Sequence, residues 1–343
     1  MEQIAKRIME RRQYYENLPS DPNAKEPSRE EFTLLLGGIS ACRRLPGVEQ
    51  HMGYETLYHC TEEQNITAVR EHLKKYNGVM DKDSLLEACY REFSTGYEYE
   101  DFMTFWKDAP KFDIAELNEQ GLQGFTYCKE LARHFYPIVG EKGFYAWDIN
   151  ERIGLCRNAV ACGIITEEEF WEITGEWVRV AQVFYHSYAE YAASCLCGAI
   201  YFMNRYSQEN TQGFLDININ VTDNLMGEGG AWQRNRWYEP KEREWAVLLR
   251  DNLGSMGCII TKKALEAESV GYMYREEPMK DMPDSGWRFF YGDEVEEYVN
   301  DPGNSSVCAV NTICNFNPDI LAYMYAKYGS RFERHEDGWH LQI

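Results

Sequence analysis

Apolar residues recur at helical spacing through the middle of the chain. After Asp148 the apolar positions are Ile149, Ile153, Cys156 and Val160, and Gly163 then follows as the expected residue that ends a helix. Two further stripes of this kind begin after Thr166 and after Ser187. Three successive amphipathic helices with short connections predict an antiparallel helical array.

Helix starts are predicted from capping boxes, in which Ser, Thr or Asp is followed three residues later by Glu or Gln. The candidate pairs are Ser28/Glu31, Thr61/Gln64, Ser84/Glu87, Asp113/Glu116, Asp148/Glu151, Thr166/Glu169 and Ser187/Glu190. They predict that the first two-thirds of the chain is helical. Residues 206–256 break this pattern with Gly, Asn and Asp clusters, which predicts loops, a short strand at Leu215–Val221 and a helix at Glu242–Leu249.

After residue 256 the pattern changes to that of short strands. The β-rich runs are GCIIT, SVGYMYRE, GWRFFYG and SVCAVNTI, and RFERHEDGWHLQI predicts a hairpin around Asp337-Gly338. One helix is expected to begin at Asn317, with Pro318 at its first position. The predicted fold class is therefore multidomain α+β, with an all-α domain followed by a small α+β domain whose sheet is mainly antiparallel.

The same change of pattern predicts the domain limits. We expect a helical extension over residues 1–29, a helical domain over 30–254 and an α+β domain over 255–343. The boundary is placed near Gly254, because the loop-rich stretch before it separates the two patterns.

Composition narrows the classes of partner. The formal net charge is −21, and such a chain repels both nucleic-acid phosphates and anionic membrane surfaces. Its 11 cysteines form no CxxC pair and several lie among apolar residues, which is typical of reduced thiols. The N-terminus lacks the apolar core of a signal peptide, and the apolar run 192–203 is too short to span a bilayer. We expect a soluble cytoplasmic protein.

Negative charge is concentrated in one stretch near the C-terminus. Between Glu276 and Asp301 the chain holds nine acidic residues against Lys280 and Arg288, whereas the rest of residues 257–343 is balanced. The spacing of GDEVEEYVNDPG does not match a calcium loop. The stretch fits a surface that attracts a basic protein, and a merely solvated acidic edge is the alternative.

Searches for catalytic and metal-binding patterns give no assignment. GxxxxGK[ST], HExxH and GxSxG are absent, so no catalytic, cofactor-binding or metal-binding residue is predicted. Ser285 follows Asp284 in a turn-like Pro-Asp-Ser-Gly sequence with no adjacent histidine. His335 and His340 flank the predicted hairpin turn, and without further ligands at fixed spacing they do not favour zinc. No cofactor is expected.

Two parts of the chain resemble families of bacterial proteins. The first resemblance, over about residues 30–240, is to domain-of-unknown-function family 1266, and it implies a helical fold without a known activity. It is carried by a WD…R helix, a glycine-containing turn and a serine-led helix, with matching residues Trp147, Asp148, Arg152, Gly163, Ile165, Glu168, Trp171, Ser187, Tyr188 and Gly198. Tyr188 stands where that family usually has Trp.

The second resemblance covers residues 257–343 and is to domain-of-unknown-function family 2185, also called immunity protein family 33. Its core is DSGW-x-F-x-x-G-D-E, and it includes Gly271, Tyr272, Arg275, Glu276, Pro278, Asp284, Ser285, Gly286, Trp287, Arg288, Gly292, Asp293, Glu294, Tyr298, Asn311 and Pro318. This resemblance implies an α+β domain that neutralises a toxin delivered between bacteria.

The leading hypothesis is a non-enzymatic, cytoplasmic binding protein whose acidic face blocks a protein partner such as a basic toxin domain. The expected partner-binding residues are Glu276, Asp284, Trp287, Asp293 and Glu294. One alternative is a hydrolase that uses the carboxylates of Asp284 and Glu294 as general acid and base. Another is a regulatory or structural protein that acts through its helical domain. The sequence leaves the oligomeric state open.

Overall fold

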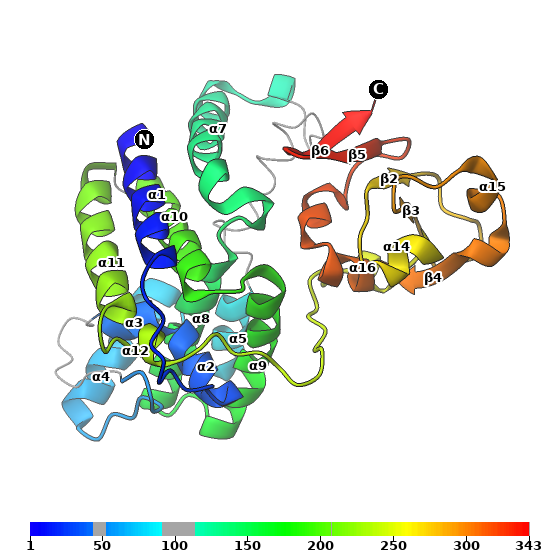
Figure 1. Cartoon of the computed structure of the whole chain (residues 1–343). Coiled ribbons are helices and arrows are strands. Elements are labelled where there is room, and N and C mark those ends of the chain that lie inside the picture. The colour runs from blue at the N-terminus through cyan, green and yellow to red at the C-terminus, as the bar shows by residue number, and fades with distance from the viewer. Residues whose placement is uncertain (44–52, 91–113, 207, 343) are drawn as a thin grey trace. The chain divides into compact units, whose positions relative to one another are not determined.

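The computed structural model describes residues 1–43, 53–90, 114–206 and 208–342, and these form two compact units. The helical unit comprises the described residues of Met1–Tyr99 and Arg133–Glu244. The sheet unit comprises the described residues of Glu100–Ala132 and Trp245–Ile343. In Figure 1 the helical unit contains the blue and light-green helices, and the strands β1 to β6 are yellow to red.

The helical unit is built from helices of very different length. Their bounds are α1 (Glu2–Glu16), α2 (Arg29–Leu36), α3 (Gly38–Cys42), α4 (Glu63–His72), the π-helical turn η1 (Leu73–Asn77), α5 (Lys82–Tyr90), the 3₁₀ turn η3 (Gly140–Lys142), α8 (Tyr145–Ala161), α9 (Glu167–Phe184), α10 (Tyr188–Tyr206), the 3₁₀ turn η4 (Gln208–Asn210), α11 (Thr211–Met226) and α12 (Ala231–Arg234). Helix α7 (Glu119–Val139), preceded by the 3₁₀ turn η2 (Ile114–Glu116), contributes its first residues to the sheet unit and its last to the helical unit.

Helix α8 forms the centre of the helical unit. It is buried on nearly all sides, because α2, α3, α4, α5, α9 and α10 all pack against it. Its residue Trp147 lies so close to Gly198 of α10 that a Cβ atom at position 198 would come within 2.4 Å of the Trp147 Cβ. Glycine at this crossing therefore allows α8 and α10 to approach each other closely.

Two of the predicted capping boxes are complete and several are not. Ser28/Glu31 starts α2 and Thr166/Glu169 starts α9, each with both reciprocal hydrogen bonds. The predicted helix end at Gly163 is confirmed by a Schellman motif, with φ of 71° at Gly163 and hydrogen bonds from Gly163 N to Val160 O and from Ile164 N to Ala159 O. For Ser187/Glu190, the Glu190 amide donates to the Ser187 hydroxyl, and the Glu190 carboxylate accepts from His186 N.

The other predicted helix starts are wrong or untested. The box at Thr61/Gln64 is wrong because Glu62 precedes α4 without a side-chain cap. The cap predicted at Ser84 belongs to Asp81, whose carboxylate accepts from Ser84 N. Asp148 lies inside α8, which begins at Tyr145. The pair Asp113/Glu116 includes a residue outside the described part of the chain.

Two further predictions for residues 206–256 are wrong. The strand predicted at Leu215–Val221 lies within α11, and the helix predicted at Glu242–Leu249 is an extended segment instead. Backbone groups of Ala246, Leu248 and Leu249 are hydrogen-bonded by the side chains of Asn311 and Asn315. Since these bonds satisfy the backbone, the segment does not need helical hydrogen bonds.

The sheet unit contains one sheet of six strands in the order β4-β1-β3-β2-β5-β6. The strands are β1 (Gly257–Thr261), β2 (Tyr272–Arg275), β3 (Asp284–Phe290), β4 (Ser305–Ala309), β5 (Arg331–His335) and β6 (Gly338–Gln342). Only β1 and β3 pair in parallel, so the sheet is mainly antiparallel and the predicted fold class is confirmed. Helix α13 (Asn252–Ser255) precedes β1, and the helical elements between the strands are α14 (Lys262–Glu266), α15 (Glu296–Val299), η5 (Pro302–Asn304), α16 (Val310–Phe316) and η6 (Pro318–Tyr323).

The two faces of the sheet differ in burial. One face carries fully buried side chains, which include Cys258, Ile260, Met273, Trp287, Phe289, Phe332 and Trp339. Tyr323 of η6 packs on this face, with its ring 4.9 Å from that of Phe332. On the other face Ile259, Tyr272, Tyr274 and Phe290 are only half-buried. The core of the sheet unit therefore lies between the sheet and the short helices that follow β4.

The predicted hairpin and the start of the predicted C-terminal helix agree with the structure. Strands β5 and β6 pair from His335↔Gly338 outward. The helix expected from Asn317 is a 3₁₀ turn, η6, with Pro318 at its start. In the described part of the chain, no helix combines the length and apolar character needed to cross a membrane.

Candidate functional site

The sequence DSGWR forms a bulge in β3. Gly257 of β1 pairs with Asp284 and Ile259 pairs with Arg288, so Cys258 alone lies opposite three residues of β3. Gly286 has φ of 79°, and a Cβ there would lie 2.0 Å from the carbonyl oxygen of Glu276. The bulge therefore requires glycine at this position.

The bulge brings Asp284 and Arg288 together. In a regular strand two residues four positions apart are separated by about 13 Å, which is too far for a salt bridge. Here Arg288 Nη1 and Nη2 donate to the two carboxylate oxygens of Asp284 at 2.9 and 2.8 Å. The amides of Met279 and Gly286 donate to the same carboxylate. The acceptor sites of the Asp284 carboxylate are therefore used by hydrogen bonds within the protein itself.

Asp284 is held in its ionised form at neutral pH. The hydrogen bonds from Arg288 lower the pKa of Asp284 to about 2, against the opposing effect of burial, and the two backbone amides lower it further. Arg288 is fixed in turn by Glu276, which accepts from its Nε at 2.6 Å. A carboxyl group held in this way is unsuited to donate a proton near neutral pH.

Ser285 and Trp287 are also parts of the folded core. The Ser285 hydroxyl donates to Gly257 O at 2.8 Å and accepts from Trp287 N, and the residue is 1% exposed. Trp287 is fully buried, stacks on Phe289 and donates from Nε1 to Met324 O. The structure therefore places Trp287 in the core of the sheet unit, where it has no exposed surface to offer to a partner.

Asp293 and Glu294 lie beyond the other end of β3. Glu294 accepts from the Thr261 hydroxyl and from the amides of Tyr291 and Gly292. Partial burial acts to raise the pKa of Glu294, but these hydrogen bonds outweigh it and hold the pKa below its usual value. Asp293 is exposed and pairs with Lys263. Glu294 thus caps the turn after β3, while Asp293 faces solvent.

The two carboxylates of the hydrolase alternative are far apart. Asp284 lies opposite Gly257, at the start of β1, and Glu294 is bound to Thr261, at the end of the same strand. Four residues of strand separate these points, which is about 13 Å. Paired catalytic carboxylates of glycosidases lie about 5 to 9.5 Å apart, so this geometry does not favour acid–base catalysis by the pair.

Exposed acidic groups gather in the connection between β3 and β4, residues 291–304, which we call the acidic connection. It holds five acids and no Lys or Arg. Asp293, Glu296, Glu297 and Asp301 are exposed, and so are the apolar side chains of Tyr291, Val295 and Val299. The other exposed acids of the stretch, Glu276, Glu277 and Asp281, precede β3 and lie toward its opposite end. The predicted acidic face is therefore divided by the length of β3.

The five predicted partner-binding residues consequently differ in accessibility. The side chains of Glu276 and Asp293 are 48% and 62% exposed, whereas that of Asp284 is 5% exposed. Trp287 is buried and Glu294 is partly buried. The sequence analysis did not predict a role for Val295 and Val299. The signal that could have found them is their position between acidic residues along the chain.

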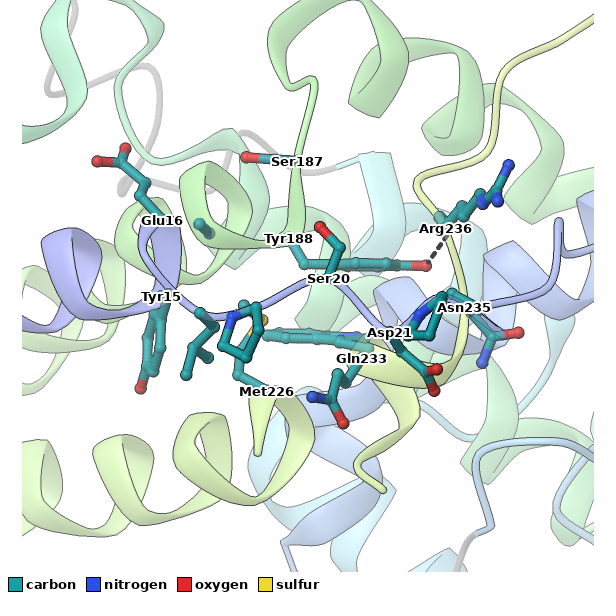
Figure 2. A pocket seen from close by; sticks show the side chains of 16 residues that line it. Tyr15, Glu16, Ser20, Asp21, Ser187, Tyr188, Met226, Gln233, Asn235 and Arg236 are labelled. Atoms are coloured by element: carbon teal, nitrogen blue, oxygen red, sulfur yellow. Dashed lines mark hydrogen bonds between the residues drawn. The ribbon is translucent and has the colours of Figure 1, made fainter. Parts of the chain in front are cut away.

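The helical unit contains a pocket of about 670 Å³, shown in Figure 2. The ring of Tyr188 stacks on Trp232 with centroids 5.3 Å apart. Asn235 is 6% exposed, and its Oδ1 has no hydrogen-bond partner among the described residues. The volume lies in the range of small-molecule sites. The lining includes Tyr15, Glu16, Ser20, Asp21, Ser187, Tyr188, Met226, Trp232, Gln233, Asn235 and Arg236.

The cluster Trp147, Asp148 and Arg152 is a core feature of α8. Asp148 and Arg152 are 1% and 8% exposed. Trp147 packs between the rings of Phe202 and Phe214, and the Arg43 guanidinium lies 5.2 Å from its ring centroid. This cluster therefore supports the packing of the helical unit.

Histidines 335 and 340 meet across the hairpin, with their rings 4.8 Å apart. His340 Nε2 lies 2.7 Å from the Asp337 carboxylate. No group of three or more His, Cys, Asp or Glu side chains suited to a metal ion is present in residues 1–43, 53–90, 114–206 and 208–342.

Comparison with known proteins gives two family matches, and both agree with the resemblances seen in the sequence. Residues 258–343 match the family described as "Immunity protein Imm33 domain". Residues 72–237 match the family described as "Protein of unknown function (DUF1266)", a match that begins later than the expected residue 30. A curated relative, "Uncharacterized protein YbeU" of Escherichia coli (strain K12), is 28% identical over 153 residues, which are 42% of this chain and 63% of that protein. No solved structure matches.

Proposed function

We propose that this protein is a non-enzymatic immunity protein that binds and neutralises a basic protein toxin through the acidic connection of its sheet unit. The Imm33 match of residues 258–343 supports the role of immunity protein. The observation that carries the choice of surface is the exposed negative charge of residues 291–304, which hold no Lys or Arg, interspersed with exposed apolar side chains.

This combination suits an interface. Carboxylates attract a basic partner and set the rate of encounter, while apolar side chains supply contact area that is desolvated on binding. Glu296 and Glu297 stand between exposed Val295 and exposed Val299, so both kinds of group lie on one short segment. A nuclease cleft that binds phosphates is one basic surface that such a segment would cover.

The geometry of the remaining predicted residues supports binding rather than catalysis. Asp284 and Glu294 are held as ionised groups by neighbouring donors, and they lie at opposite ends of β1. Their role in this proposal is to fix β3 and the turn that begins the acidic connection. Glu276 and Asp293 remain proposed partner contacts.

The test removes charge from the acidic connection without touching its structural cap. The variant Asp293→Asn, Glu296→Gln, Glu297→Gln keeps Glu294, and Glu63→Gln, Glu71→Gln, Glu228→Gln is the matched control, because it makes the same charge change at exposed sites of the helical unit. Each protein is used as bait at low and physiological salt, and retained proteins are identified by mass spectrometry. We expect a basic protein that wild type and control retain and the acidic-connection variant loses.

The proposal requires that this variant alone loses a partner, and that wild type retains the partner more weakly at physiological salt than at low salt. Retention of the same set of proteins by all three baits would show that the acidic connection is not the binding surface.

A further inference from the structure

Strand β4 forms an edge of the sheet. In the described residues β1 is its sheet neighbour, and the strand order places nothing on its other side (Figure 1). Val307, at the middle of β4, is 75% exposed, which is the largest exposure among the large hydrophobic residues described. The outer side of this strand is therefore open.

The hydrogen-bond pattern shows which backbone groups point outward. Val310 N donates to Met256 O at 3.0 Å, whereas Gly257 N donates to Pro283 O on the side of β3. Backbone groups of an antiparallel strand point alternately to its two sides. Cys308 and Ser306 therefore face β1, and the N–H and C=O groups of Val307 and the N–H group of Ala309 point away from the sheet. The Ala309 carbonyl is used by α16, because Ala309 is the N-cap of that helix.

The sequence of β4 does nothing to protect this edge. Natural proteins block edge strands with Lys, Pro, inward-pointing charges or bulges. The strand SSVCA has no charge and no proline, and it pairs with β1 in continuous register from Thr261↔Ser305 to Gly257↔Ala309. An unprotected, regular edge is a template for another strand.

The charge next to β4 indicates what kind of strand fits. The acidic connection runs directly into Ser305, and its last carboxylate, that of Asp301, precedes this first residue of the edge by four positions. A second copy of this chain brings the same negative segment and is repelled, whereas a basic strand is attracted. Val307 pairs with Ile259, and both side chains lie on the half-buried face of the sheet. Every second side chain of an added strand would point to this face and would have Val307 as an apolar neighbour.

We propose that the partner binds by adding a basic, extended strand to the outer edge of β4, hydrogen-bonded to the N–H and C=O groups of Val307 and to the N–H group of Ala309. This inference rests on the proposed function and specifies its binding mode. Main-chain hydrogen bonds supply affinity, and the acidic connection selects a partner strand that carries Lys or Arg.

The decisive variant is Val307→Pro, with Val307→Thr as its matched control. Proline removes the outward N–H of residue 307 and leaves the bonds between β4 and β1 intact, because those use Ser306 and Cys308. Threonine keeps the N–H and the β-branched shape. The probe is the peptide Ac-Lys-Val-Lys-Val-Lys-Val-Lys-NH₂. A second peptide is N-methylated at every residue, which keeps its charge but removes the N–H groups from both strand edges. Binding to the full-length protein is measured by calorimetry.

We expect the unmethylated peptide to bind wild type and Val307→Thr within about threefold of each other, and Val307→Pro at least about tenfold more weakly. The peptide should also slow amide exchange of Val307 and Ala309, observed by NMR. Equal binding by the Pro and Thr variants, equal binding of the methylated peptide, absence of binding, or self-association of the chain through β4 overturns strand addition.

The charge variant of the acidic connection separates this inference from the proposed function. If the charge variant no longer binds the peptide while Val307→Pro still binds it, the acidic connection remains the proposed binding surface and strand addition fails. If both variants bind like wild type, strand addition fails, and partner retention by the baits described above decides the proposed function on its own.

Discussion

At the scale of single residues, the motif DSGWR is a structural device. Its Asp and Arg form a buried ion pair, its Ser fixes the turn of the backbone, and its Gly permits the bulge. The sequence indicated the importance of these residues but not their burial, because the strand period puts Asp284 and Arg288 far apart. In the sequence, the only sign of the bulge is Gly286, which lies between Asp284 and Arg288.

Replacement of Asp284 by Asn should destabilise the sheet unit by about 3 kcal/mol, since it leaves the buried Arg288 guanidinium with only the half-exposed Glu276 as a charged partner. Urea denaturation followed by hydrogen exchange of peptides from β1 and β3 measures this change. Glu277→Gln is the control, because Glu277 is exposed. A similar unfolding midpoint for both variants would contradict the assigned role of the pair.

The lowered pKa of Asp284 predicts that the stability of the sheet unit depends on pH. Hydrogen bonds from Arg288 lower the folded-state pKa of Asp284 to about 2, below the unfolded value of about 3.9. The contribution of ionised Asp284 to the free energy of unfolding is therefore fully present above about pH 4 and is lost as the pH falls toward 2. We expect wild type to lose more stability than Asp284→Asn across this interval, measured by the same exchange method.

At the scale of elements, α11 shows why part of the chain was mispredicted. Its buried residues Leu215, Asn218, Ile219, Thr222 and Leu225 follow helical spacing. Asn218 and Thr222 disguise that spacing because they are polar, and β-branched residues alternate between them. Asn218 Nδ2 donates to Phe214 O, and the Thr222 hydroxyl bonds to Tyr15, so both polar groups are satisfied inside the fold. Tertiary contacts of this kind are invisible to a local pattern.

The crossing of α8 and α10 gives a test at the same scale. Gly198→Ala should destabilise the helical unit by about 1 to 3 kcal/mol, because its methyl group meets Trp147. Gly213→Ala in α11 is the matched control, since its Cβ meets nothing within 4 Å. That change should stabilise by up to about 1 kcal/mol through helix propensity. Thermal denaturation of both variants measures these changes. Equal melting temperatures for Gly198→Ala and Gly213→Ala would contradict a close crossing of α8 and α10.

At the scale of the whole molecule, the extended segment before α13 determines where the sheet unit begins. Asn311 and Asn315 of α16 bind the backbone of Ala246, Leu248 and Leu249, and these three residues are buried. Local sequence could not predict this, because the partners lie more than 60 residues away. A domain start at Trp245 is our proposal in place of the sequence-based start at residue 255.

Two fragments test that start. A fragment over 245–343 should be more stable than one over 255–343 by at least about 3 kcal/mol, because two leucine side chains and the asparagine hydrogen bonds are retained. Chemical denaturation followed by circular dichroism measures the difference. Equal stability of the two fragments would support the later boundary.

The pairing order of the sheet has a consequence for synthesis on the ribosome. Strand β1 pairs with β3 and β4, and β2 pairs with β5, which in turn pairs with β6 near the C-terminus. Phe332 and Trp339, from the last two strands, complete the core around Trp287. The helical unit ends at Glu244, so it can fold during translation while the sheet unit waits for its final strand. A nascent chain would thus gain its binding surface only after β6 has been synthesised.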